Sequence, residues 1–314
     1  MRRISAALAL VAALLTLAPA SRAEPSIWYR ASHPRARAEA RLLRAIERML
    51  DGEGQIVTDP ERASHFARAA VAMLDLQRPG VPEDPRLACA MARALLGANL
   101  GREAQAEALL ADAIPKLPEG TLLVTAWHEL GRARARHGDL AGARDATTRV
   151  LELAVDPTER ALAFYERARA ELRLGEVSEA ALDFRSASDA APTELVRLRA
   201  RYGLGVALER SGDLAGAWLA LEQVASVRLP LSQYPSEDPL DLPGAFEPEY
   251  ELDYTKALVA LTRARSAGDP DDRREALGDS LRHWDAYLEH APASAPWLVN
   301  ARKFREQTTR ELKK

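Results

Sequence analysis

Basic and aromatic side chains recur at four-residue steps in three successive stretches of the sequence. In the first stretch His128, Arg132 and Arg136 follow one another in this way. Residues four apart share one face of a helix, and arginine binds carboxylates through two parallel hydrogen bonds. We therefore predict a partner-binding basic stripe for acidic groups, which consists of His128, Arg132, Arg136, Tyr165, Arg169, Arg173, Tyr202 and Arg210.

The competing interpretation of this stripe is an ordinary solvated helix face. Arginine supplies most of the basic residues throughout the chain, so some of the alignment arises by chance. The carboxylates of Glu129, Glu166 and Glu209 also stand near enough in sequence to neutralise part of the charge. Both interpretations stay open at the level of the sequence.

Residue patterns typical of catalysis are absent from the sequence. It contains no paired-histidine zinc motif, no phosphate-binding glycine loop and no serine nucleophile motif. His283 and His290 lie seven residues apart on one helix face, but no third ligand accompanies them, and we interpret them as surface or packing residues. We expect no enzyme activity, no metal site and no cofactor.

The elements that would carry the stripe repeat every 37 residues. A glycine marks each unit and is expected to end its first helix in a left-handed conformation. Small and larger side chains follow at steps of four and three residues, which places them on one buried face of a second helix. The glycines are Gly101, Gly138, Gly175 and Gly212, and the buried positions are Ala106, Leu110, Ala113, Ala143, Thr147, Val150, Ala180, Phe184, Ala187, Ala217, Leu221 and Val224.

These units resemble the tetratricopeptide repeat family. Trp127, Leu130 and Gly131 match its Trp-x-x-Leu-Gly signature, and Leu204 and Gly205 repeat the last pair. The resemblance implies an all-α, right-handed α-solenoid of stacked helical hairpins, whose first helices line a concave binding groove.

The third unit departs from the family pattern. Arg167 and Glu171 stand where the family buries a leucine and a tyrosine, and Arg134 replaces the same tyrosine in the second unit. The period also exceeds the family's typical 34 residues, so we expect longer connections between the units.

The segments around the repeats complete the predicted organisation. We assign 1–23 to a signal peptide, 24–86 to one or more N-terminal helical hairpins and 87–230 to four tetratricopeptide-like repeats. Residues 231–249 form a proline-rich acidic loop, and 250–314 a degenerate repeat with a C-terminal capping helix. The capping helix suits a stacked array, which needs a polar end.

The N-terminal assignment rests on a short apolar stretch. Arg2 and Arg3 precede 4–17, which carries no charge and is shorter than a membrane span. Small residues suited to a signal peptidase follow at 18–20 and 21–23. We expect a periplasmic or secreted protein with no transmembrane span after cleavage.

Charge and cysteine content narrow the classes of partner. The formal net charge is −3, and loss of the three arginines in 1–23 would bring it to about −6. A mildly acidic protein is a poor candidate for nucleic-acid binding. Cys89 is the only cysteine, which excludes an internal disulfide, and we expect a buried thiol there.

Two functions fit these features. The first is a protein–protein interaction scaffold in a bacterial-type cell envelope assembly, which binds an acidic or extended segment of a partner protein through the groove or the acidic loop. The alternative is a glycan- or peptidoglycan-binding accessory to an envelope enzyme. Sugar binding favours aromatic platforms, and the predicted stripe offers only Tyr165 and Tyr202. The acidic loop itself is either a recruiting element or a spacer.

Overall fold

The computed structural model describes residues 34–50, 60–77, 82–231, 236–241 and 248–314. The predicted signal peptide lies outside them. The helices are α3 (Pro34–Leu50), α4 (Pro60–Gln77), α5 (Pro85–Ala98), α6 (Glu103–Ala113), α7 (Thr121–His137), α8 (Leu140–Leu153), α9 (Pro157–Leu174), α10 (Val177–Asp189), α11 (Glu194–Ser211), α12 (Leu214–Glu222), α13 (Tyr250–Ser266), α14 (Pro270–His290) and α15 (Leu298–Leu312), with a short 3-10 helix at Ile114–Lys116.

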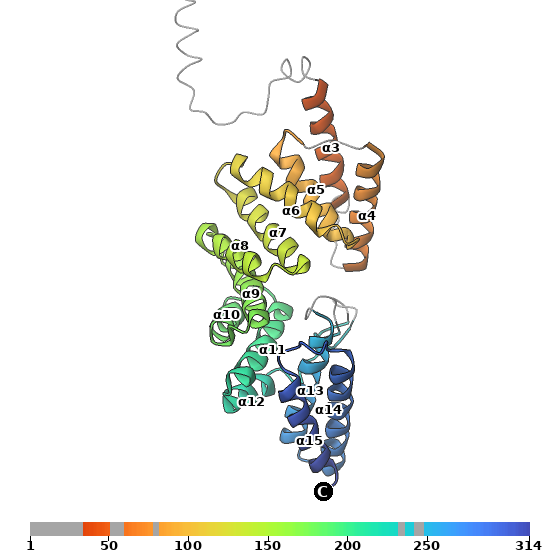
Figure 1. Cartoon of the computed structure of the whole chain (residues 1–314), viewed down its shortest axis with the longest axis vertical. Helices are drawn as coiled ribbons and strands as arrows, with labels where there is room; N and C mark the ends of the chain where they lie inside the picture. The colour runs from red at the N-terminus through yellow and green to blue at the C-terminus, as the bar shows by residue number, and fades with distance from the viewer. Residues whose placement is uncertain (1–33, 51–59, 78–81, 232–235, 242–247) are drawn as a thin grey trace, which may run out of the picture.

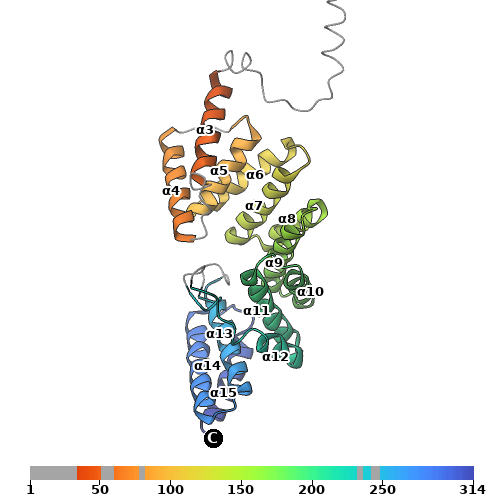
Figure 2. The same cartoon turned by 180° about the vertical axis from the view of Figure 1, so that it is seen from behind.

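The helices pack in chain order into an elongated array. Each helix contacts the next along the chain, and first helices of successive hairpins also contact one another. Figures 1 and 2 show α3–α7 at one end of the array and α13–α15 at the other, with α4 and α14 on the same side. The described ranges hold helices and no strand, so the prediction of an all-α solenoid of stacked hairpins is confirmed. None of the described helices is long and apolar enough to cross a membrane.

The repeated buried positions behave as the 37-residue period predicts. The four units are the hairpins α5–α6, α7–α8, α9–α10 and α11–α12. Every one of the repeated positions is at most 2% exposed, including Val224, which lies two residues beyond the end of α12. The polar exception, Thr147, satisfies its hydroxyl within the helix by donating to the Ala143 carbonyl oxygen at 2.9 Å. Some of these side chains pack within their own hairpin, as Leu221 does beside Gly205, and Phe184 packs against Gly203 of the next hairpin.

Helix ends follow the prediction in three units and differ in the first. Gly138, Gly175 and Gly212 close their helices at φ of 93°, 83° and 90°. In the first unit, however, α5 ends at Asn99, whose φ is 53°, and Gly101 lies two residues further on. The expectation that Gly101 closes this helix is wrong, because asparagine also tolerates the left-handed region. The first unit is therefore two residues longer, measured between helix ends, than the other units.

Two glycines of α11 allow its neighbours α10 and α12 to approach it closely. A Cβ on Gly203 would lie closer than 3.0 Å to three ring carbons of Phe184 in α10. A Cβ on Gly205 would come equally close to the Leu221 side chain in α12. The Leu-Gly pair of the fourth unit thus marks a close approach of helices, as at Gly131, where a Cβ would meet Thr147 at 3.1 Å.

The C-terminal helices bury an aromatic cluster. Tyr254, Trp284 and Tyr287 are fully buried, and the Trp284 ring stacks on Phe304 of α15 at 5.5 Å between centroids. Helices α13 and α14 form the hairpin expected of a degenerate repeat. Within the acidic loop, the described Leu240 is 1% exposed and belongs to the same core.

The charged departures of the third unit are paired with one another. Arg167 donates to both carboxylate oxygens of Asp183, at 2.5 and 3.0 Å, which joins α9 to α10. Glu171 lies on the other side of Arg167, with 3.7 Å between Nε and Oε1. Its second oxygen is buried and has no hydrogen-bond partner among the described residues. A single guanidinium therefore faces two buried carboxylates.

This imbalance makes the stability of the third unit depend on pH. Burial and, next, the Asp183 carboxylate raise the pKa of Glu171, Arg167 offsets part of this rise, and the resulting pKa is about 7. Since the folded pKa lies above the ordinary 4.5, the neutral carboxyl stabilises the fold fully below about pH 4.5, and this stabilisation is lost as pH rises through 7. The full effect is about 3 kcal/mol.

Glu171→Gln should remove most of this pH dependence. We expect the variant to match the wild type near pH 5 and to exceed it in denaturant unfolding at pH 8.5 by about 2–3 kcal/mol. Glu275→Gln, at an exposed position of α14, is the matched control and should leave the pH profile unchanged. Parallel pH profiles for the wild type and Glu171→Gln would show that the carboxyl is not the responsible group.

Candidate partner-binding groove

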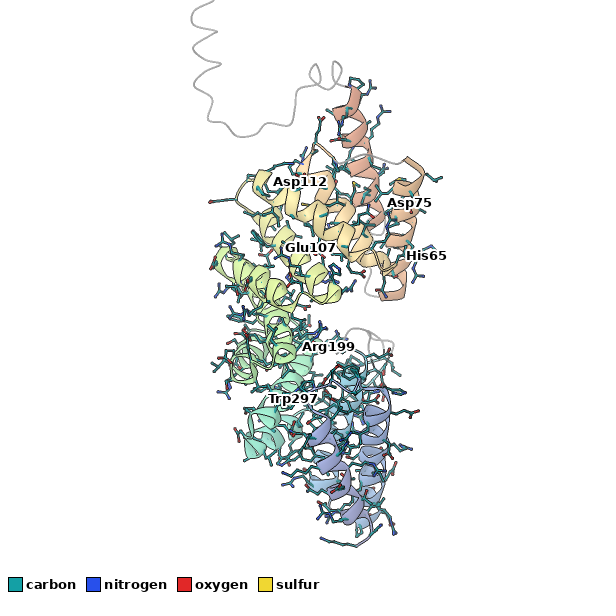
Figure 3. The ribbon with its side chains drawn as sticks, in the orientation of Figure 1. His65, Asp75, Glu107, Asp112, Arg199 and Trp297 are labelled. Atoms are coloured by element: carbon teal, nitrogen blue, oxygen red, sulfur yellow. The ribbon has the colours of Figure 1, made fainter. Side chains whose placement is uncertain are left out.

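A groove of about 1080 Å³ runs along one face of the array. Its walls come from α4 and from α5, α7, α9 and α11, the first helices of the four units, and Figure 3 shows His65 of α4 and Arg199 of α11, which both line it. Its ionisable lining residues are His65, Arg68, Arg93, His128, Glu129, Arg132, Arg136, Glu166, Arg169, Arg173 and Arg199, together with the buried phenol of Tyr165.

The lining carries a charge opposite to that of the whole chain. Among the described lining residues, seven arginines face two glutamates, which gives a net of five positive charges with both histidines neutral. The complete sequence has a formal charge of −3. Positive charge concentrated in a concave, low-dielectric surface strengthens its field toward anions. The groove therefore attracts acidic groups electrostatically.

Six residues of the predicted stripe line this groove, and two do not. His128, Arg132 and Arg136 project from α7, and their counterparts project from α9. Tyr202 is instead 1% exposed and donates its hydroxyl to the Val224 carbonyl oxygen at 3.0 Å. Arg210 is 9% exposed and is paired with Glu251 of α13. The stripe thus ends at the third unit, because the C-terminal helices cover the corresponding face of α11.

Two arginines of the groove tie successive first helices together. Arg136 donates from Nη1 to the Leu96 carbonyl oxygen at 2.7 Å, and Arg173 donates to the Ala135 carbonyl oxygen at 3.2 Å. These carbonyls belong to the last turns of α5 and α7, where no amide four residues further on completes the helical pattern. The Ala135 carbonyl oxygen also accepts the N–H of Gly138, which closes α7. A cation there also complements the negative end of the helix dipole.

Two other arginines have a carboxylate beside them on the same helix. Arg132 contacts Glu129 and Arg169 contacts Glu166, each at 3.2 Å between nitrogen and oxygen. Arg169 also lies over the Tyr165 ring, 5.6 Å from its centroid. Each glutamate neutralises one guanidinium only, so the groove keeps its positive excess.

The positive charges of the groove shift the pKa of one of its carboxylates, Glu166. Burial by itself raises the pKa of Glu166, but Arg169, His128, Arg132 and Arg136 outweigh this effect and lower the pKa below its ordinary value. Cations from both α7 and α9 therefore act on the same carboxylate. An incoming carboxylate would meet the same set of charges.

Sequence reasoning missed four basic residues of the lining. Arg93 lies in α5, and Arg199 lies in α11 outside the four-residue pattern. Arg68 and His65 come from α4, upstream of the recognisable repeats; Arg68 donates to the Ala98 carbonyl oxygen at 3.3 Å. Of these four residues, Arg93 is the one that a sequence pattern could have revealed. It stands six residues before the left-handed residue that closes its helix, as Arg132 and Arg169 do in theirs.

A buried polar cluster closes the C-terminal side of α11. The Arg210 guanidinium lies 4.8 Å from the ring centroids of both Tyr254 and Trp297 and is paired with Glu251. The adjacent Glu209 accepts a hydrogen bond from the Tyr254 hydroxyl at 2.7 Å. Figure 3 shows Trp297 where the fourth unit meets the C-terminal helices. The cluster fixes α13–α15 to the end of the repeat array.

Within the described residues, no group of three or more histidine, cysteine, aspartate or glutamate side chains could hold a metal ion. Cys89 is buried as expected, and its burial, followed by the Asp84 charge, raises the pKa of the thiol to about 11.

The chain resembles known proteins in its structure but not detectably in its sequence. No protein-family model and no curated protein matches the sequence. The chain is similar to BtubC from P. vanneervenii, with 17% identity and a TM-score of 0.46 over 84% of this chain and 96% of that one. It is also similar to a MamA RS-1 double mutant, with 18% identity and a TM-score of 0.43 over 67% of this chain and 96% of that one. A third similar structure is a Podosopora anserina putative kinesin light chain with TPR-like repeats, with 19% identity and a TM-score of 0.41 over 74% of this chain and 97% of that one. The solenoid assignment itself rests on this chain's own hairpins.

Breaking the Arg210 pair should destabilise the protein far more than breaking a surface pair. We expect Arg210→Met to lower the free energy of unfolding by about 3–5 kcal/mol, because Glu251 is then left buried and unpaired. Arg197→Met removes an exposed pair with Glu194 on the same helix and should cost less than about 1 kcal/mol. Denaturant unfolding measures both.

The double variant Arg210→Met/Glu251→Leu should recover much of that loss, since neither charge then remains alone. Equal destabilisation by the two single arginine variants would contradict the assigned difference between the buried and the exposed pair.

Proposed function

We propose that the chain is an exported protein–protein interaction scaffold in a bacterial-type cell envelope assembly, and that it holds an acidic segment of a partner protein in the basic groove. A helical repeat fold of this kind is a scaffold for protein partners. The observation that carries the proposal is the net of five positive charges in a concave groove of about 1080 Å³ on a chain whose overall charge is negative. Protein partners with carboxylate side chains match it in charge and geometry.

The groove suits a protein segment better than a glycan. Glycan-binding sites present open aromatic faces, and the aromatic side chain that lines this groove is Tyr165, which is 7% exposed. Tyr202, the second ring of the predicted stripe, lies in the core. Arginine side chains dominate the surface instead.

The acidic loop supports a second contact in the same proposal. Its described part carries Glu237, Asp238 and Asp241, and the Glu237 carbonyl oxygen accepts a hydrogen bond from Leu229 at 2.7 Å. Leu240 anchors this part in the core, while Asp241 pairs with Lys256 of α13 at 2.6 Å. These contacts hold the acidic groups of 236–241 at a fixed place.

Charge reversal in the groove tests the binding function. Peptides selected from a random display library on the immobilised protein should be rich in Asp and Glu. Binding of these peptides to the Arg132→Glu/Arg169→Glu variant should fall at least about tenfold, since two attractive charges become repulsive.

The matched control reverses two exposed arginines of the C-terminal helices, Arg282→Glu/Arg305→Glu, and should bind as the wild type does. Circular dichroism verifies that both variants keep their helices. Selection of peptides without acidic enrichment, or equal binding by the two double variants, would refute the groove as the binding surface.

Export is tested on the full-length chain with a C-terminal tag. We expect the protein in the periplasmic fraction, with a new N-terminus at Ser21 or Glu24. Leu14→Arg/Leu15→Arg places two charges in the apolar stretch and should retain the uncleaved chain in the cytoplasm. Recovery of the wild-type chain from the cytoplasm with Met1 in place would contradict export.

A further inference from the structure

Three arginines of the groove occupy the same position in three successive hairpins. Arg132 and Arg169 each precede the left-handed glycine that closes their helix by six residues. Arg93 precedes Asn99, the left-handed residue that closes α5, by the same interval. All three line the groove. We name this set the arginine ladder.

The spacing of the ladder follows from helix packing. Helix α5 contacts α7, and α7 contacts α9. Packed helices lie about 8–10 Å apart, so successive guanidinium groups at equivalent positions are separated by about the same distance. The ladder crosses the helices, and a bound segment that meets every rung must do the same.

One extended conformation of a peptide has this repeat. A polyproline II segment has three residues per turn and rises about 3.1 Å per residue, so every third side chain points the same way at intervals of about 9 Å. It forms no internal hydrogen bonds, and unfolded chains adopt it readily. In a β-strand, residues three apart point to opposite faces, which would remove every second carboxylate from the ladder.

The ladder has three rungs because the fourth hairpin breaks it. Val206 stands at the equivalent position of α11 and is 1% exposed. Arg210, one turn further along the helix, is engaged by Glu251. A segment in register with three rungs spans about seven residues.

The first rung differs from the other two in its local electrostatics. Glu129 and Glu166 stand three residues before Arg132 and Arg169, whereas Ala90 stands three residues before Arg93. Helix α5 itself contains no acidic residue. A ligand carboxylate at Arg93 therefore competes with no carboxylate from its own helix, and this rung should contribute most to binding.

We infer that the basic groove recognises a partner segment in the polyproline II conformation that carries three acidic residues at every third position. This inference rests on the proposed function and specifies the ligand of the same site. The Arg68, Arg136 and Arg173 side chains are bonded to helix carbonyls, so they add background charge but do not set the register.

Two labelled peptides of equal composition test the register. The first is Glu-Pro-Ala-Glu-Pro-Ala-Glu, and the second, Glu-Glu-Glu-Pro-Ala-Pro-Ala, clusters the same three carboxylates. Fluorescence anisotropy with the protein purified from full-length expression should show about tenfold tighter binding of the first peptide. Arg93→Gln should weaken that binding about three- to tenfold and at least as much as Arg132→Gln or Arg169→Gln, while Arg197→Gln should leave it unchanged.

The outcomes separate the register from the binding function. Equal affinity for both peptides, lost in Arg132→Glu/Arg169→Glu, would overturn the ladder and leave the acidic groove intact. Failure of either peptide to bind, together with a library selection without acidic enrichment, would overturn the proposed function itself. A fourth glutamate in the same register that tightens binding by another factor of ten would overturn the three-rung limit.

Discussion

The carbonyl groups in the last turn of a helix cannot all be bonded by the helix's own amides, and arginine side chains of neighbouring helices bond several of them on the concave face of the molecule. Arg136 and Arg173 satisfy such carbonyls in the preceding unit, at distances of 2.7 and 3.2 Å. Arg68 of α4 does the same for the Ala98 carbonyl oxygen at the end of α5, at 3.3 Å. A guanidinium also complements the negative end of the helix dipole. The interaction that joins one hairpin to the next therefore places positive charge on the concave face of the second and third units.

Other arginines of the same helices are available for binding a partner. Arg132 and Arg169 lie one helical turn before Arg136 and Arg173, and each forms an ion pair with a glutamate of its own helix. Contacts of this partly exposed kind are weak, because solvent screens them and side-chain entropy opposes them. A partner carboxylate can replace the internal one at small cost. Arg136 and Arg173 join the helices that form the groove, whereas Arg132 and Arg169 supply the contacts that a partner carboxylate can replace.

The sequence predicts the fold better than it predicts the limits of the site. A fixed period of 37 residues determines which side chains of each second helix are buried, so the hairpins follow from spacing alone. The same period misplaces Tyr202 and Arg210, because the packing of α13–α15 against α11 is a long-range event that no local pattern encodes. It also hides Arg93, since the connection after Asn99 contains two extra residues and shifts the register. Whether the six groove residues of the stripe bind a partner stays a prediction.

The charge of the groove opposes the stability of the array. Like charges on adjacent helices repel, and desolvation in a concave surface strengthens that repulsion. At the fourth unit the chain avoids the cost: Val206 replaces the ladder arginine, and Glu251 with Tyr254 and Trp297 surrounds Arg210. The same solution was open to the first three units, which instead line the groove with five arginines and two glutamates, an excess of three positive charges. Natural proteins retain such locally unfavourable arrangements mainly at functional sites, and the contrast between the neutralised fourth unit and the three charged ones is the physical argument that this groove binds an anionic partner.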